Sequence, residues 1–271
     1  MKVLELKNLV KIYNDSEIKV KAVDNVNLSF EQGEFAAIVG PSGSGKTTLL
    51  NMIGGLDNPT EGDININNTS ISELYKYISF KKPKLSLVVK VLSYITIVPA
   101  LIREIIILPS LIKKSIAEKK LITFRLNNIG FVFQAYNLIP VLTAKENVEF
   151  IMELQGIKRI ERDERSIELL SAVGIADRAN SRPSKLSGGQ QQRVAVARAL
   201  ASKPEFILAD EPTANLDSKS TETLLDIMEQ LNKEENITFI FSTHDQRVVN
   251  KARRVITVED GRVVSDEKRG Q

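Results

Sequence analysis

The chain has 271 residues, of which 42% are hydrophobic, which is enough for the core of one large domain. Its net charge of +3, from 37 basic and 34 acidic residues, is close to balance and gives no indication of nucleic-acid binding. The absence of cysteine and the single histidine exclude disulfides, thiolate metal sites and multi-histidine metal centres. The N-terminus shows no secretory signal, so we expect a cytoplasmic protein.

The first thirty residues predict two half-buried antiparallel strands. Apolar residues recur over 2–10 and again, mostly in alternation with polar ones, over 20–30. Tyr13 follows the first of these strands. Its ring could offer a face on which a purine stacks, or it could be an edge tyrosine that packs on its neighbour. Spacing alone leaves both interpretations open.

A glycine-rich stretch at 40–48 follows a short apolar strand over 34–39 and precedes a predicted helix over 48–53. It matches the phosphate-loop pattern G-x-x-x-x-G-K-[ST] at every fixed position. Its glycines let backbone N–H groups approach phosphate oxygens, and the helix N-terminus adds about half a positive charge. We expect Lys46 to bridge the outer phosphates and the Thr47 hydroxyl to hold Mg²⁺. The predicted binding residues are Gly40, Pro41, Ser42, Gly43, Ser44, Gly45, Lys46, Thr47 and Thr48.

Regular patterns continue on either side of an irregular stretch at 75–118. A turn-rich segment at 54–63 leads to a short strand over 64–67, and an apolar strand over 128–134 ends in Gln134. Thr143 and Glu146 have the spacing of a capping box, which predicts a helix that runs through Leu154. A second helix is predicted over 162–173, with Gly174 as its stop.

A second capped helix start lies at 186–190, with the sequence Leu-Ser-Gly-Gly-Gln. Ser187 and Gln190 again have capping-box spacing, and a helix over 191–201 follows. A helix N-terminus can bind an anion, whereas the plain alternative is an ordinary capped helix. Gly188 and Gly189 favour the anion site, because each glycine costs about 1 kcal/mol relative to alanine in a helix.

Two acidic residues end a buried strand predicted over 205–212. Carboxylates at the C-terminal end of a parallel strand point into the ligand crevice. Asp210 suits Mg²⁺ and Glu211 suits a base that positions the attacking water. His244 ends another buried strand over 237–243, where contact with a γ-phosphate competes with a structural role. A helix around 224–231 and a terminal hairpin over 255–264 complete the pattern.

These motifs, in this order, resemble the nucleotide-binding subunit of ABC transporters. The resemblance covers residues 1–74 and 119–265, and its most specific part is the signature at 186–190. It implies an α/β P-loop ATPase core with an antiparallel β subdomain and a helical subdomain that carries the signature. We therefore expect a single domain at 1–265 and a short tail at 266–271.

The resemblance implies two copies that face each other head to tail around two ATP molecules. The signature of one copy would cap the γ-phosphate of the ATP bound by the other, through Ser187, Gly188, Gly189 and Gln190. Asp217 would lie at the dimer seam, and Tyr13 would stack on adenine.

The catalytic set implied by the resemblance comprises Glu211, His244, Gln134 and Lys46. Gln134 would join Thr47 and Asp210 at the metal and link it to a transport partner.

A finer resemblance concerns the transport partner. Residues 131–140 and 243–246 resemble the lipoprotein-release, macrolide-efflux and antimicrobial-peptide-resistance group. This implies a separate permease with four transmembrane helices and a large extracytoplasmic domain, and a location at the cytoplasmic face of the plasma membrane. A chromosome-maintenance ATPase would need long charged coiled coils, which the sequence lacks. A regulatory module of a permease-like cell-wall or division complex stays open as an alternative.

The stretch at 76–118 departs from the family as an insertion of about 40 residues relative to the family pattern. Its apolar part, 85–112, has basic residues on both flanks, which favours one cytoplasmic side. Pro99 and Pro109 would kink or break a helix. We expect a helical hairpin, too short to span a bilayer, that contacts the membrane surface. Packing on the permease and burial of the apolar face on itself are the alternatives.

Overall fold

The computed structural model describes residues 1–14, 19–78 and 108–269. In these ranges a six-stranded sheet forms the centre, with strand order β10-β9-β3-β8-β7-β6. All of its neighbouring strands are parallel except β10, which pairs antiparallel with β9 at the edge. Its strands are β3 (Phe35–Val39), β6 (Ile129–Val132), β7 (Phe206–Asp210), β8 (Thr238–Ser242), β9 (Arg254–Glu259) and β10 (Arg262–Lys268).

A four-stranded antiparallel sheet forms the second layer. Its order is β2 (Val20–Glu31), β1 (Lys2–Tyr13), β4 (Glu61–Ile66) and β5 (Thr69–Ser70). The two strands predicted near the N-terminus are confirmed, and β1 runs on to Tyr13. The predicted architecture of an α/β core with an antiparallel β subdomain is therefore confirmed.

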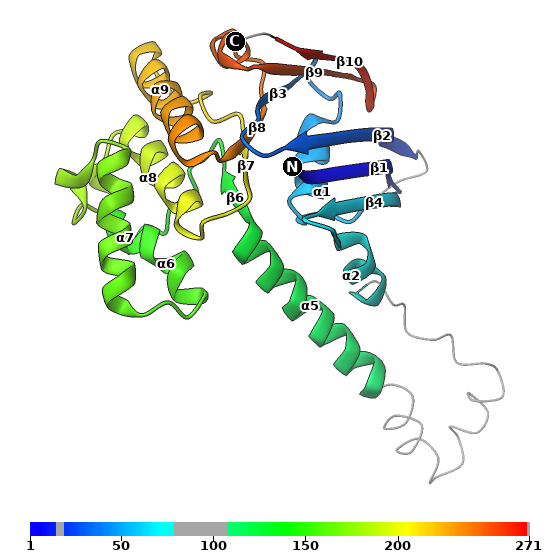
Figure 1. Ribbon diagram of the computed structural model, residues 1–271, viewed down its shortest axis with the longest axis horizontal. Helices are drawn as coiled ribbons and strands as arrows, with labels where there is room; N and C mark the ends of the chain where they lie inside the picture. The colour runs from blue at the N-terminus through cyan, green and yellow to red at the C-terminus, as the bar shows by residue number, and fades with distance from the viewer. Residues whose placement is uncertain (15–18, 79–107, 270–271) are drawn as a thin grey trace.

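The helices lie on either side of the central sheet. Figure 1 shows α6, α7, α8 and α9 on one side and α1, α2 and the antiparallel sheet on the other. The helices are α1 (Lys46–Ile53), α2 (Ile71–Ile78), α5 (Leu108–Asn128), α6 (Ala144–Leu154), α7 (Arg159–Ala172), α8 (Gly188–Ala201), α9 (Ser218–Glu235) and α10 (Gln246–Lys251). Short 3-10 turns at Ala176–Arg178 and Pro183–Lys185 lead into α8.

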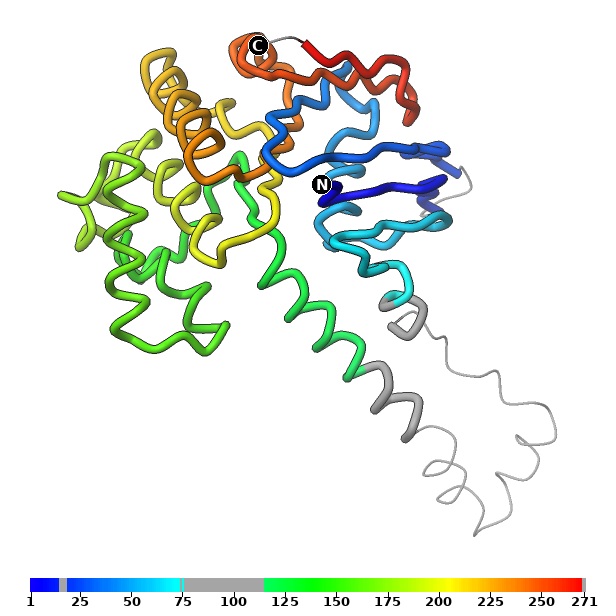
Figure 2. The backbone as a smooth tube through the Cα atoms, in the orientation of Figure 1, coloured from blue at the N-terminus to red at the C-terminus, as the bar shows by residue number. Residues whose placement is uncertain are grey.

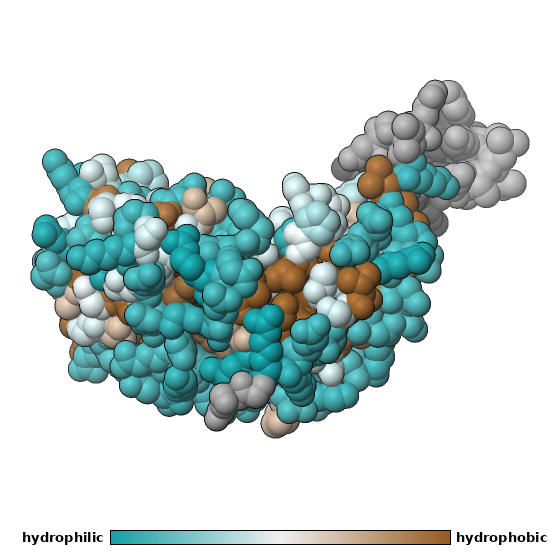
Figure 3. Space-filling model, turned by 90° about the horizontal axis from the view of Figure 1, so that it is seen from above, coloured by the Kyte–Doolittle hydropathy of each residue, from teal (hydrophilic) through white to brown (hydrophobic). Residues whose placement is uncertain are grey.

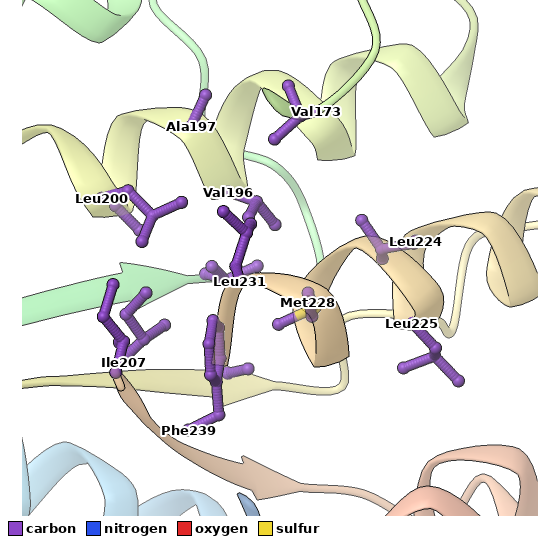
Figure 4. Packing of buried hydrophobic residues seen from close by; sticks show 14 of the residues in the cluster. Val173, Val196, Ala197, Leu200, Ile207, Leu224, Leu225, Met228, Leu231 and Phe239 are labelled. Atoms are coloured by element: carbon purple, nitrogen blue, oxygen red, sulfur yellow. The ribbon is translucent and has the colours of Figure 1, made fainter. Parts of the chain in front are cut away.

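The central strands are buried on both faces, as their continuous apolar runs predict. In β3, Phe35 and Ala37 face the helical side, whereas Ala36 and Ile38 face α1 and the antiparallel sheet. Figure 4 shows the helical side, where Ile207 and Phe239 of the sheet meet side chains of α8 and α9. These two clusters fix the carboxyl ends of the strands, from which the functional loops emerge.

Both predicted capping boxes are confirmed. Thr143 caps α6 and Ser187 caps α8, each with a reciprocal bond from the residue three positions on. Two boundaries differ from the predictions: α8 begins at Gly188 rather than 191, and α7 begins at Arg159 rather than 162. Gly174 has a φ of 68°, as a helix stop requires.

The end of the insertion is part of a 21-residue helix, α5, which continues without a break to Asn128. Pro109 lies in the first turn of α5, where a missing N–H costs nothing, so the described helix begins at this proline and is not interrupted by it. Tyr75 of α2 and Leu121 of α5 belong to the same buried cluster. Figure 2 shows α5 leading back to β6 in the middle of the molecule. The predicted hairpin around Pro99 lies outside the described residues, and none of the helices that the structure describes is long and apolar enough to cross a membrane.

The C-terminus differs from the predicted tail at 266–271. Strand β10 runs to Lys268, and Asp266 forms two hydrogen bonds of 2.7 Å with Arg254. The Arg254 guanidinium also binds Glu34 and lies over the Phe30 ring. The boundary at 265 was therefore wrong, because residues 266–268 hold the edge of the central sheet.

Candidate active site

A pocket of about 600 Å³ lies at the carboxyl ends of β3, β7 and β8. It brings the predicted phosphate loop together with three predicted catalytic residues from distant parts of the chain. It is lined by Ala22, Gly40, Pro41, Ser42, Gly43, Ser44, Gly45, Lys46, Thr47, Thr48, Gln134, Glu211 and His244.

The phosphate loop has the tight curl that its glycines predict. Gly45 has a φ of 99° and caps α1, and a Cβ atom there would lie 2.1 Å from the carbonyl oxygen of Ala22. Lys46 turns back over the loop and donates hydrogen bonds of 2.9 Å to the carbonyl oxygens of Gly40 and Pro41. The ammonium thus lies beside the loop, where phosphate oxygens would compete for it.

Thr47 and Asp210 bring two oxygen atoms together beside the loop. The Thr47 hydroxyl lies 3.3 Å from Oδ1 of Asp210. Burial raises the pKa of Asp210, and the Thr47 hydroxyl opposes that shift. A nearby cation would stabilise the ionised carboxylate, and hydroxyl and carboxylate oxygens are ligands that Mg²⁺ prefers. No group of three or more His, Asp or Glu side chains within the described ranges could hold a metal, so a cation here would take most of its ligands from water or phosphate.

Glu211 stands at the end of β7 in a left-handed conformation, with a φ of 46°. Its Oε1 lies 2.7 Å from Nδ1 of His244, and its Oε2 accepts a hydrogen bond of 3.2 Å from Thr243. His244 is 75% exposed at its side chain, whereas that of Glu211 is 17% exposed. The predicted base and the predicted γ-phosphate ligand are therefore neighbours.

The segment after Gln134 is held by side chains that sequence reasoning missed. Arg198 of α8 donates to the carbonyl oxygens of Tyr136, at 2.9 Å, and Asn137, whose φ values are 60° and 50°. Asn215 donates to the carbonyl oxygen of Gln134 at 3.0 Å. No local pattern marks these residues, because their partners are 61 to 81 positions away.

The same segment separates the nucleotide pocket from a second cavity of about 420 Å³. Gln134 lines the first pocket, whereas its neighbours Phe131, Phe133 and Asn137 line the second. The rest of that lining is mostly apolar and comes mainly from α5, β6, α6 and α8. Figure 3 shows a largely hydrophilic face with hydrophobic residues gathered near its middle.

The signature residues do not line the nucleotide pocket of their own chain. Ser187 is exposed, and its hydroxyl caps α8 by accepting a hydrogen bond from the backbone N–H of Gln190. A Cβ atom on Gly188 would lie 2.8 Å from the Tyr136 hydroxyl, so a larger residue there would require the Tyr136 side chain to shift. Asp217 caps α9 through bonds of 2.9 and 2.7 Å to Ser220.

Tyr13 also lies outside the lining of that pocket. Its hydroxyl donates a hydrogen bond of 2.7 Å to Oδ2 of Asp57, and the Lys11 ammonium lies 4.9 Å from its ring centre. Lys11 is itself paired with the other oxygen of Asp57. The ring is therefore half-buried and held from one end, and stacking on adenine stays a prediction.

Comparison with known proteins gives a single family. Residues 23–98 and 109–214 match the model of the ABC transporter family. An ABC transporter ATP-binding protein of Thermotoga maritima is 40% identical over 99% of this chain and 97% of its own length. The macrolide export ATP-binding/permease protein MacB of Hyphomonas neptunium is 40% identical over 97% of this chain, which corresponds to 34% of MacB.

Solved structures indicate the same family. The ATP-binding cassette MJ0796, in a dimeric post-hydrolysis state bound to ADP and Pi, aligns with a TM-score of 0.76 and 39% identity. The alignment covers 99% of this chain and all of that one. An ABC transporter ATP-binding protein of that name comes from Methanocaldococcus jannaschii. Sequence, fold and pocket agree: the chain belongs to the ABC transporter ATP-binding family and is an ATPase.

Proposed function

We propose that two copies of this chain close head to tail around two ATP molecules, each held by the phosphate loop of one copy and residues 187–190 of the other. The observation that carries this proposal is the position of the signature. Ser187 and the glycines of the first turn of α8 form an exposed helix start that contributes nothing to the pocket of their own chain. The N-terminus of α8, with glycines in its first turn, suits an anion, and in a dimer that anion would be the ATP bound by the other copy.

The residues in and beside the pocket then take the following roles in phosphoryl transfer. Lys46 and the loop amides bind the phosphates. Thr47, Asp210 and Gln134 would hold Mg²⁺, which neutralises charge on the phosphate oxygens when it is bound.

The remaining roles concern the attacking water and the base of the nucleotide. Glu211 orients the water, His244 contacts the γ-phosphate, and Tyr13 stacks on adenine. Asp217 lies near the seam, since it binds Ser220, whose hydroxyl would lie 2.9 Å from a Cβ atom on Gly189.

The work of this ATPase is done on a separate permease at the cytoplasmic face of the plasma membrane. The name of MacB joins macrolide export with a permease, which supports a permease as the transport partner. The four-helix type with a large extracytoplasmic domain rests on the resemblance of residues 131–140 and 243–246 alone. The apolar cavity beside Gln134 offers the contact, because Phe133 lines that cavity and Gln134 lines the nucleotide pocket. Movement of a permease segment bound in this cavity would therefore shift Phe133 and, through the backbone, its neighbour Gln134 in the nucleotide pocket.

The insertion adds a contact with the membrane surface, through residues 85–112. Supporting it in the described part of the chain, Ile116 on α5 is 49% exposed, and Lys119 and Lys120 are exposed on the same helix. Apolar side chains next to lysines suit an anionic bilayer interface. Replacing residues 79–107 by a Gly-Ser linker should abolish co-sedimentation with phosphatidylglycerol vesicles; unchanged co-sedimentation would contradict the membrane contact.

Two variants test the shared site. Lys46→Ala should lose both ATP binding and hydrolysis, since it removes the phosphate contact. Ser187→Arg should lose hydrolysis and ATP-driven dimerisation, yet bind ATP as a monomer with the affinity of the unmodified chain. Equilibrium binding of a fluorescent ATP analogue and size-exclusion chromatography give the two measurements. If Ser187→Arg lost ATP binding as completely as Lys46→Ala, the signature would act on its own chain's nucleotide.

A further inference from the structure

The backbone of Glu211 is held in place independently of its side-chain contacts. Its φ of 46° is a conformation that a residue with a Cβ atom adopts only at a cost. Its N–H donates a hydrogen bond of 2.9 Å to the carbonyl oxygen of Ser242, the last residue of β8. The turn after β7 is therefore tied to the neighbouring strand, and the Glu211 carboxylate projects toward the residues that follow β8.

Two side chains from that neighbouring strand end meet the two oxygens of the carboxylate. His244 meets Oε1 at 2.7 Å and Thr243 meets Oε2 at 3.2 Å. The two partners differ in freedom, because the His244 side chain is 75% exposed whereas Thr243 is fully buried. His244 can leave this contact to meet a phosphate, but the Thr243 hydroxyl has no room to follow it.

The hydroxyl of Thr243 also has a defined direction. It accepts a hydrogen bond of 3.0 Å from the backbone N–H of Asp245, which leaves its own hydrogen to be donated to Glu211. The Thr243 backbone N–H donates to the carbonyl oxygen of Ile38 at 3.1 Å. Ile38 belongs to β3, the strand that leads into the phosphate loop. Thr243 thus joins the carboxylate of Glu211 to the strand that positions the phosphates.

We propose that Thr243 is a positioning residue for ATP hydrolysis: its buried hydroxyl holds one oxygen of the Glu211 carboxylate while His244 releases the other. The second oxygen is then directed at the attacking water. This inference rests on the proposed role of Glu211 and adds a residue to it. Small errors in the placement of a catalytic group have large effects on rate, so the hydroxyl acts on turnover and not on nucleotide affinity.

The test compares three variants of the full chain. Thr243→Val keeps the size of the side chain and removes the hydroxyl, so kcat should fall about tenfold or more, with KM for ATP within about twofold of the unmodified chain. Thr243→Ser restores the hydroxyl and should recover kcat to within about threefold. Thr213→Val is the matched control, because Thr213 is equally buried and binds Asp245 at 2.8 Å without a contact to Glu211; its kcat should stay within about twofold. If Thr243→Val does not fold, Thr243→Ala makes the same comparison.

Several results would overturn the inference. A kcat for Thr243→Val equal to that of the unmodified chain would do so, as would a failure of Thr243→Ser to recover activity. An equal loss in Thr213→Val would show that the buried network acts through stability alone. Glu211→Gln separates the role of Thr243 from the role of Glu211. If Glu211→Gln is inactive while Thr243→Val is fully active, only the role of Thr243 is wrong, whereas full activity of Glu211→Gln would overturn the role of Glu211 itself.

Discussion

Arg198 connects the signature helix α8 to the segment that carries Gln134, and its replacement should lower the unfolding free energy of the protein. In Arg198→Met the carbonyl oxygens of Tyr136 and Asn137 lose a charged donor while both residues keep left-handed backbones. A hydrogen bond from a charged group contributes about 1.5–3 kcal/mol. Burial of the guanidinium opposes this, since it lowers the pKa of Arg198, and methionine removes that cost. The expected net loss of unfolding free energy is about 2–3 kcal/mol.

Urea denaturation followed by far-UV circular dichroism measures this loss, because the chain has no tryptophan to report it by fluorescence. With a slope of about 3 kcal/mol per molar for a chain of this size, the midpoint should fall by about 0.8 M. ATP binding should not change, because Arg198 does not line the nucleotide pocket. Arg193→Met is the control on the same helix, since the bonds of Arg193 to Val173 and Gly174 are 3.3–3.4 Å long and therefore weak. Equal midpoints for the two variants would refute the reasoning.

Three further substitutions test the charges of the fold and of the site. Asp210→Asn should abolish hydrolysis yet raise the melting temperature of the ligand-free protein by about 1–3 °C, because burial raises the pKa of Asp210 and its charged form costs stability above that pKa; a lower melting temperature would contradict this. Arg247 lowers the pKa of Asp245 from 3.8 to about 2, so the stability that Asp245 contributes is present above pH 4 and lost toward pH 2. The deficit of Asp245→Asn in urea titrations should therefore be seen at pH 6 and vanish near pH 2. Arg254→Met should cost about 3–5 kcal/mol of unfolding free energy by urea denaturation, since it leaves Glu34 and Asp266 without their buried partner; a loss below about 1 kcal/mol would show that β10 is held otherwise.

The parts of the site that could be predicted from the sequence are those whose chemistry is local. A strand, a glycine loop and a helix in succession place Lys46 and Thr47, and capping boxes place Thr143 and Ser187 within a few residues of their partners. Asp210 was predictable because a carboxylate after a buried parallel strand faces the ligand crevice.

Contacts between distant segments could not be predicted in this way. Thr243 and Glu211 are 32 positions apart, and Arg198 and Asn137 are 61 apart. Thr243, Arg198 and Asn137 look ordinary in their own neighbourhoods, and only the tertiary fold brings them to their partners. The start of α5 beside Pro109 also could not be placed in advance, since the apolar run continues across it without a change in pattern.

The head-to-tail closure of two copies can be measured most directly by cross-linking, because the chain has no cysteine of its own. Ser42 in the phosphate loop and Ser187 at the signature are both exposed. The two single variants Ser42→Cys and Ser187→Cys, each also carrying Glu211→Gln to slow hydrolysis, are mixed with ATP and a short thiol-reactive cross-linker. We predict a covalent dimer in the mixture with ATP, and little without ATP or in either variant alone. Cross-linking of each variant to itself with the same efficiency, or none in the mixture, would contradict the shared site.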